Sequence, residues 1–367
     1  MRILQVAPLV SPIDETREPI GGAQVLLADL ARGLAQRGHE ITLAAAEGSR
    51  LAGVRVASIG IDGTLLRRAS LAATEGTRPD DAEQARAFAA VRAWVDGHAE
   101  EIDVIHLHAY DAPAFDLFRD APRPVVHTLH LPPLDATVVR SARAATDATM
   151  VTVSEANARG WRAAGVPVAR VIYNGIDVTR IPLGDQRGPH LVCAGRVSPE
   201  KGTRDAVLVA QRSGRPLLIV GGVYDEAYFA NAVAPHVLQA LEWTVGDPVD
   251  GILYLGPRRR EELLTIVGSS SGSLMPVRWE EPFGLVAVES LATGTPVFGF
   301  RRGGLSEIVD ETCGALVPRG DVDALIRVLA AAPSFEPAAC RRRADGFSLD
   351  AMVAGYEALY RHVRTGA

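Results

Sequence analysis

Short apolar runs alternate with helical stretches along almost the whole chain. Strands are predicted at residues 3–7, 41–45, 54–59, 104–107, 125–129, 149–153 and 171–173. A second series of predicted strands lies at residues 191–194, 217–220, 252–255, 273–275, 296–300 and 315–317. Between the runs, apolar side chains recur at helical spacing, as at Leu26, Leu30 and Leu34. This alternation predicts an α/β protein with parallel sheets.

The two series of strands are separated by residues 179–190, which lack periodicity and are rich in Pro, Gly and charge, as is typical of a linker. A length of 367 residues also fits two domains. We therefore predict two Rossmann-like domains facing across a cleft, at residues 1–182 and 183–348. Residues 349–367 are predicted to form a final helix, because Met352, Tyr356, Leu359 and Val363 fall on one face.

The composition excludes several classes of protein. Hydrophobic residues make up 47% and charged residues 22%, which excludes disorder. A net charge of -6 without a basic tract argues against a nucleic-acid partner. The three cysteines form no C-x-x-C pair, which fits a reducing cytoplasm. No signal-peptide pattern or apolar run of about 18 residues is present, so we expect a cytoplasmic protein without a transmembrane segment.

Two glycines could help to bind a phosphate. The fingerprint G-x-G-x-x-G follows none of the predicted strands, which argues against a nicotinamide or flavin dehydrogenase. Gly21 and Gly22 lie where the first loop meets its helix, and the free N–H groups of a helix start can bind an anion. On these residues alone, a flexible turn that opens a helix explains the pair better.

Lys201 is the only lysine in the chain, although Lys and Arg together number 38. Arg196 directly follows a predicted strand and Lys201 opens the next helix. Both residues are therefore expected at the carboxyl ends of the strands, where ligands bind in open α/β sheets. Two cations at that edge suit a diphosphate. Considered alone, Lys201 is explained better as an ordinary lysine on a solvent-exposed face, with no role in binding.

Two glutamates flank a short loop in the second half of the chain. Glu281 is expected in the loop and Glu289 in the first turns of the next helix, with the N–H groups of Gly284 and Leu285 between them. A carboxylate can accept hydrogen bonds from two neighbouring hydroxyls, so such a pair suits a sugar and a ribose. Compensation of the helix dipole explains any single glutamate at a helix start.

Taken together, these motifs resemble the retaining family-four glycosyltransferases of GT-B fold. The resemblance spans nearly the whole chain, and its most specific parts are G-R-x4-K-G and the E-x7-E pair around P-F-G. It is carried by the segments GGAQVLLADLARGLAQRGHEIT, VIHLHAY, VVHTLH, VSEANARG, YNGID, AGRVSPEKG and EEPFGLVAVESLATGTPVFGFRRGGLSEIV.

The resemblance implies transfer of a sugar, with retention, from a nucleoside-diphosphate sugar to an acceptor hydroxyl. The sequence lacks an evident basic amphipathic helix, which favours a small soluble acceptor over a lipid-linked one. UDP is the expected nucleotide, and neither a metal ion nor another cofactor is expected. The first domain would bind the acceptor and the second the donor, and the final helix would return to the first domain. The resemblance assigns the donor site to Gly21, Gly22, Arg196, Lys201, Glu281, Phe283, Gly284, Leu285 and Glu289.

The same resemblance gives roles to single residues. Arg196 and Lys201 would bind the diphosphate, and Glu289 would bind the ribose. Glu281 would bind the hydroxyls of the transferred sugar, with His130 beside that sugar. The residues that it implies as catalytic are His130, Arg196, Lys201 and Glu281.

Other interpretations stay open at this stage. A sugar-nucleotide epimerase shares the two-domain fold, and a catalytically silent homologue could act as a partner of another transferase. Asp321 and Asp323 imitate a D-x-D metal motif, but they precede a helical run and capping explains them better. The histidines between His106 and His130 lack a nearby carboxylate or cysteine that would complete a metal site. Residues 223–251 are longer than a minimal version of the fold needs and predict an extra helix.

Overall fold

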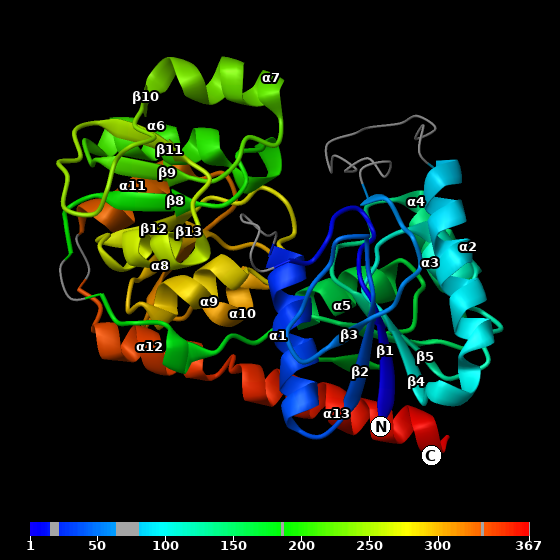
Figure 1. The fold of residues 1–367 in the computed structure, drawn as a ribbon. Coiled ribbons are helices and arrows are strands. Elements are labelled where there is room, and N and C mark those ends of the chain that lie inside the picture. The colour runs from blue at the N-terminus through cyan, green and yellow to red at the C-terminus, as the bar shows by residue number, and fades with distance from the viewer. Residues whose placement is uncertain (15–21, 64–80, 185–186, 332–333, 367) are drawn as a thin grey trace. The chain divides into compact units, whose positions relative to one another are not determined.

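The chain forms two compact units, each built on a seven-stranded parallel sheet (Figure 1). The structure, a computed structural model, describes residues 1–14, 22–63, 81–184, 187–331 and 334–366. The first unit comprises Met1–Gly175 and Leu349–Ala367, and the second comprises Ile176–Ser348. The first unit therefore gives way to the second after Gly175, before the boundary expected after residue 182. The reason is that Ile176 pairs with Ser348 and Arg341 binds the carbonyl oxygens of Val178 and Ile181.

The first sheet has the strand order β3-β2-β1-β4-β5-β6-β7. Its strands are β1 (Arg2–Val6), β2 (Glu40–Ala44), β3 (Arg55–Val56), β4 (Val104–Leu107), β5 (Val125–Leu129), β6 (Thr149–Thr152) and β7 (Arg170–Val171). Its helices are α1 (Gly22–Gln36), α2 (Asp81–Gly97), α3 (Ala112–Asp116), α4 (Ala136–Ala144), α5 (Glu155–Ala163) and α13 (Leu349–Thr365).

Helix α13 is the last helix of the chain and packs on α1 within the first unit (Figure 1). Its apolar stripe is buried, with Tyr356 and Tyr360 among the most buried large side chains of the protein. Gly33 of α1 lies so close to Val353 that a Cβ there would meet a methyl carbon at 2.5 Å. The helix is thus part of the core of the first unit.

The second sheet has the order β10-β11-β9-β8-β12-β13-β14. Its strands are β8 (Leu191–Ala194), β9 (Leu217–Val220), β10 (Leu238–Gln239), β11 (Ile252–Gly256), β12 (Gly272–Met275), β13 (Val297–Phe300) and β14 (Gly314–Val317). Its helices are α6 (Thr203–Ser213), α7 (Glu226–Tyr228), α8 (Arg260–Gly268), α9 (Leu285–Ala292), α10 (Leu305–Ile308), α11 (Val322–Ala330) and α12 (Pro337–Asp345).

The extra helix expected within residues 223–251 is confirmed. Helix α7 continues into a π-helical turn at Phe229–Val233 and a 3-10 turn at Ala234–His236, and the short edge strand β10 follows. Val233 is buried in the core of the second unit, and Phe229 packs on Tyr254 of β11. The segment therefore covers one face of the second sheet.

Each sheet contains a point at which the order of its strands reverses. In the first sheet this point lies between β1 and β4, and in the second between β8 and β12. Loops that leave the carboxyl ends of two such strands diverge to opposite faces of the sheet, which leaves a crevice where α/β proteins bind ligands. A ligand site in the second unit is therefore expected at the loops after β8 and β12.

No helix in the described ranges is long and apolar enough to cross a membrane.

Candidate functional site

Lys201 and Glu281 meet at the reversal point of the second sheet. Lys201 ends the 3-10 turn Pro199–Lys201 after β8, and Glu281 lies in the loop after β12. The Lys201 Nζ lies 2.7 Å from Glu281 Oε2, and the indole N–H of Trp279 donates to the same oxygen at 2.8 Å. The Glu281 side chain is 7% exposed and that of Lys201 is 22% exposed. Two residues predicted at the donor site are thus in contact.

Arg196 lies on the same edge of the sheet but is held more loosely. Its guanidinium stacks over the ring of Tyr224 at 4.6 Å and lies 3.5 Å from a carboxylate oxygen of Glu200. With 35% of its side chain exposed, Arg196 can reach a ligand. Tyr224, in the loop after β9, was not singled out by the sequence.

Glu289 pairs with Arg260, a residue that the sequence analysis missed. The Nε and Nη2 atoms of Arg260, at the start of α8, lie 3.0 and 2.9 Å from Glu289 Oε1. Glu289 lies in α9, and its side chain is 15% exposed. Both printed contacts of Arg260 are thus to one oxygen of this carboxylate. No local sequence pattern predicts the ion pair of Arg260 and Glu289, because the two residues come from different helices.

Gly284 and Leu285 present backbone donors at the start of α9. Gly284 caps the helix in the left-handed region, with φ of 107°. Neither its N–H nor that of Leu285 makes a hydrogen bond within the described ranges. The neighbouring Phe283 was predicted at the donor site, but its side chain is buried and packs on Phe347 with ring centroids 5.6 Å apart. Phe283 anchors the loop through the core, and its ring is not exposed to a ligand.

A pair of glycines supports the loop that carries Glu281. The N–H of Gly303 donates to Glu280 Oε2 at 2.9 Å, and that of Gly304 donates to the Glu281 carbonyl at 2.7 Å. A Cβ on Gly303 would lie 2.1 Å from the same carbonyl oxygen. The double glycine after β13 was the one sequence signal that could have indicated this support.

The turn and the helix after β8 are also joined to the loop after β12. The carboxylate of Asp205, almost fully buried, accepts two hydrogen bonds from Arg278 at 2.5 and 2.7 Å. That pairing raises the pKa of the Arg278 guanidinium. Gly202 has φ of +73°, and a Cβ there would lie 1.9 Å from the Pro276 carbonyl oxygen. The turn that carries Lys201 therefore lies directly against the loop that carries Glu281.

The first unit holds the other predicted residues. Gly21 lies outside the described residues, whereas Gly22 is the exposed first residue of α1. His130 follows β5, and its Nε2 lies 2.9 Å from His108 Nδ1. Burial lowers the pKa of His130 to about 4. His127 is not part of this contact, because its ring stacks on Phe115 at 4.4 Å.

The two aspartates of the D-x-D pattern have structural partners among the described residues. No group of three or more His, Cys, Asp or Glu residues in the described part of the chain is placed to hold a metal ion. Asp321 caps α11 by accepting a hydrogen bond from the Ala324 N–H at 2.8 Å, which is the role predicted for it. Asp323 forms an ion pair with Arg212.

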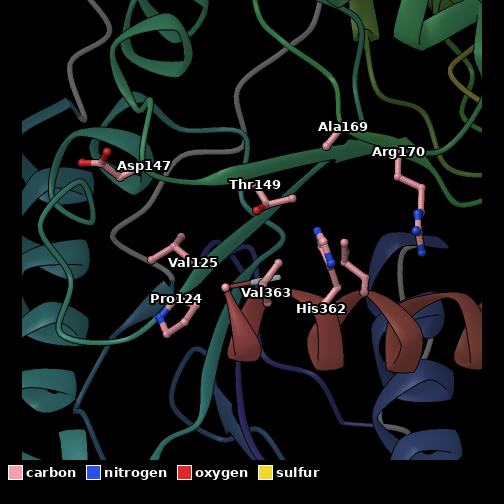
Figure 2. A pocket seen from close by; sticks show the side chains of 10 residues that line it. Pro124, Val125, Asp147, Thr149, Ala169, Arg170, His362 and Val363 are labelled. Carbon is pink, nitrogen blue, oxygen red and sulfur yellow. The ribbon is translucent and has the colours of Figure 1, made fainter.

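A cavity of about 370 Å³ in the first unit is separate from these residues (Figure 2). It lies where β5, β6 and β7 begin and where α13 ends, and its polar lining includes Thr149, Arg170 and His362. His130 comes after the carboxyl end of β5, at the opposite edge of the sheet. None of the predicted site residues lines the cavity.

Two family models match the chain, one on each side of the expected linker. "Glycosyltransferase Family 4" matches residues 20–180, and "Glycosyl transferases group 1" matches residues 188–332. Glycogen synthase of Mycobacterium tuberculosis is 33% identical over 192 residues, which are 49% of this chain and 43% of that enzyme. D-inositol 3-phosphate glycosyltransferase of Mycobacteroides abscessus is 32% identical over 161 residues, 40% of this chain and 35% of that enzyme. The matches therefore span less than half the length of these relatives.

Comparison with solved structures gives the same fold over nearly the whole chain. The Anabaena protein HepE in complex with UDP-glucose has a TM-score of 0.69 and 19% identity, and the match covers 98% of this chain and 100% of that one. Two parallel seven-stranded sheets with this similarity show the GT-B fold. Both family models that match the chain describe glycosyltransferases, and together they cover most of its length.

Proposed function

We propose that this protein transfers a glycosyl group from a UDP-sugar to a hydroxyl of a small acceptor, with retention and without a metal ion. The observation that carries the proposal is the contact of Lys201 with Glu281 at the strand-order reversal of the second sheet. Arg196 follows the same strand as Lys201, and Glu289 lies in the helix after the loop of Glu281. This combines two cations with two carboxylates, as a diphosphate flanked by a sugar and a ribose requires.

The charge of the diphosphate can be met by the protein itself. Arg196 and Lys201 supply two positive charges, and the unpaired N–H groups of Gly284 and Leu285 supply donors at the positive end of α9. Preorganised donors of this kind stabilise charge that develops on a leaving group. In the proposed reaction the acceptor oxygen forms a bond to the anomeric carbon of the sugar. The bond between that carbon and the diphosphate oxygen breaks at the same time. The acceptor proton passes to the departing phosphate oxygen on the same face of the sugar.

The nucleotide and the acceptor are inferred from the relatives. UDP is supported by the similarity to the UDP-glucose complex of HepE, which has the same fold. The name of one curated relative suggests D-inositol 3-phosphate as the first small acceptor to test. The name of another suggests glycogen as a polymeric acceptor for comparison, and the proposal expects it to be the poorer acceptor.

The test is a thermal-shift screen of UDP, ADP and GDP and their sugars, followed by mass spectrometry of products. A ligand at 100 times its Kd adds about 2.7 kcal/mol to stability, so UDP should raise the Tm measurably. Glu289→Ala, which removes the proposed ribose ligand, should reduce that shift. A protein whose Tm responds to no nucleotide would overturn the proposal.

The same assay tests independence from metal ions. Turnover should persist in EDTA because Arg196 and Lys201 take the place of a cation. Loss of turnover in EDTA that Mg²⁺ or Mn²⁺ restores would reject this part of the proposal. NMR of the product reports whether the anomeric configuration is retained.

A further inference from the structure

His108 and His130 share a single hydrogen bond between ring nitrogens. His108 lies directly after β4 and His130 directly after β5, and Nδ1 of the former is 2.9 Å from Nε2 of the latter. The rings are nearly parallel, with centroids 5.2 Å apart and an angle of 24°. Burial lowers the pKa of both rings, to about 4 for His130 and well below the ordinary value for His108. Both imidazoles are therefore neutral near pH 7.

A neutral imidazole carries one N–H and one bare nitrogen, so the contact has only two possible arrangements. Either His108 donates from Nδ1 to Nε2 of His130, or His130 donates from Nε2 to Nδ1 of His108. In the second arrangement the proton of His108 would sit on its Nε2.

The surroundings of His108 decide between the two. Its Nε2 is buried and has no hydrogen-bond partner within the part of the chain that the structure describes. An unpaired buried N–H is rarer in proteins and more costly than an acceptor with a free lone pair. The proton of His108 therefore belongs on Nδ1, from which it donates to His130.

His106 holds the ring of His108 in place from the other side. The centroids of these two rings are 3.9 Å apart. His106 is itself held at both nitrogens, with Nδ1 2.6 Å from the Tyr360 hydroxyl and Nε2 2.7 Å from Thr128 Oγ1. His108 thus packs against a ring that is itself fixed by two hydrogen bonds.

We propose that His108 is a positioning residue, which keeps His130 in the tautomer protonated at Nδ1. The Nε2 lone pair of His130 is then occupied, and its Nδ1–H makes no hydrogen bond to any described residue. His130 therefore offers a hydrogen-bond donor to the bound sugar and cannot serve as a general base through Nδ1. This role rests on the proposed function, whereas the tautomer itself does not.

The direct test is the long-range ¹H–¹⁵N spectrum of the full-length protein labelled with ¹⁵N-histidine at pH 7.5, without ligand. His130→Asn identifies the His130 signals among the nine histidines. We expect a protonated Nδ1 and a bare Nε2 in His130. A wild-type spectrum with the proton on Nε2 overturns the inference, whatever the variants do.

Two variants of His108 separate positioning from simple packing. His108→Asn keeps an N–H at about the place of Nδ1, whereas His108→Phe keeps a ring and removes the donor. We expect the tautomer of His130 to persist in His108→Asn and to move toward Nε2–H in His108→Phe. An unchanged tautomer in folded His108→Phe overturns the inference. If His108→Phe does not fold, the spectra of the wild type and His108→Asn decide.

Activity provides a second readout. His108→Phe should lower kcat with a UDP-sugar about tenfold, as expected for one lost hydrogen bond, and His108→Asn should restore most of it. Equal loss in both variants, with the tautomer of His130 kept in His108→Asn, would show that the donor is unimportant and overturn the positioning role. If the wild type transfers no sugar from any nucleotide, the proposed function fails while the spectrum still decides the tautomer.

Discussion

The ion pair of Lys201 and Glu281 is the contact that a donor must rearrange. Each side chain neutralises the other, and Trp279 provides one more donor to Glu281. In the proposed complex, a diphosphate would attract the Lys201 ammonium and leave the Glu281 oxygens for sugar hydroxyls. Because Glu281 is nearly buried, removing Lys201 leaves its negative charge without a cation, which costs stability as well as activity.

Lys201→Ala should lower kcat by about 10²–10³, the scale for losing one donor that stabilises developing charge. Lys201→Arg should restore only part of this, because a planar guanidinium does not reproduce a compact ammonium. Initial rates with saturating UDP-sugar measure both effects. Arg215→Ala is the control, since Arg215 precedes β9 at the opposite edge of the sheet. A near-normal kcat in Lys201→Ala would remove Lys201 from the mechanism.

His127 makes stability depend on pH. Its ring is 1% exposed, and neither nitrogen has a hydrogen-bond partner among the described residues. Burial lowers the pKa of His127 to about 3, below the value near 6.5 expected in the unfolded chain. As the pH falls below about 6.5, the unfolded chain therefore binds a proton that the folded protein does not bind. The stabilising contribution is complete above that pH and is lost as the pH falls toward the folded pKa.

We expect the free energy of unfolding to fall by about 1.4 kcal/mol per pH unit for each such histidine below pH 6.5. His127→Leu should flatten this slope by that amount and should be at least as stable as the wild type at pH 7, because it removes an unpaired buried polar group. Urea titrations between pH 7 and pH 5 measure both effects. His362→Ala, at an exposed position on α13, is the control. An unchanged slope in His127→Leu would contradict the assignment.

At the scale of elements, the turn at Gly202 keeps the loops after β8 and β12 together. Gly202 and Gly214 both have left-handed backbones, with φ of 73° and 66°. Only Gly202 also lies against another backbone, where a Cβ would meet the Pro276 carbonyl oxygen at 1.9 Å. Nothing lies within 4 Å of the corresponding position at Gly214.

Gly214→Ala should therefore cost about 1–2 kcal/mol, the usual cost of a left-handed backbone for a residue with a Cβ. Gly202→Ala should cost more, because the Pro276 backbone must also move, and should weaken the UDP-induced thermal shift. Urea unfolding and thermal shifts of the two variants provide the comparison. Equal stability and equal UDP response would show that the close contact at Gly202 is unimportant.

The elements also show what a sequence can and cannot predict. Strands β4, β5, β8 and β9 have the bounds that their apolar runs predict, because buried parallel strands need continuous apolar sequence. Strand β10 was missed because its two residues are exposed and form a ladder only with β11. Helix α12 was missed because it is rich in arginine and buries only Cys340 and Ala344.

For the candidate site, too, the sequence predicted some features and could not predict others. Motif spacing predicted that Arg196 and Lys201 follow one strand and that Glu281 and Glu289 follow another. It could not predict which side chains hold them, because those contacts join separate loops and helices. Arg260 meets Glu289 from α8, and Trp279 meets Glu281 only through the path of the loop.

At the scale of the whole molecule, the chain leaves the first unit, forms the second and then returns. Leu349–Ala367 belongs to the first unit, where Gly175 N–H donates to the sulfur of Met352 and Tyr356 and Tyr360 are buried. The first unit therefore needs the end of the chain to complete its core. The second unit is continuous in sequence and contains Arg196, Lys201, Glu281 and Glu289.

This asymmetry predicts that residues 176–348 fold on their own and bind UDP, whereas residues 1–175 without α13 do not form a stable core. The isolated second unit should show a UDP-induced rise in Tm but transfer no sugar, because His130 is in the other unit. Lys201→Ala within the fragment is the matched control and should reduce the rise, since it removes one of the two cations for the diphosphate. If UDP raises the Tm of the full chain but not that of the folded fragment, nucleotide binding depends on residues of the first unit.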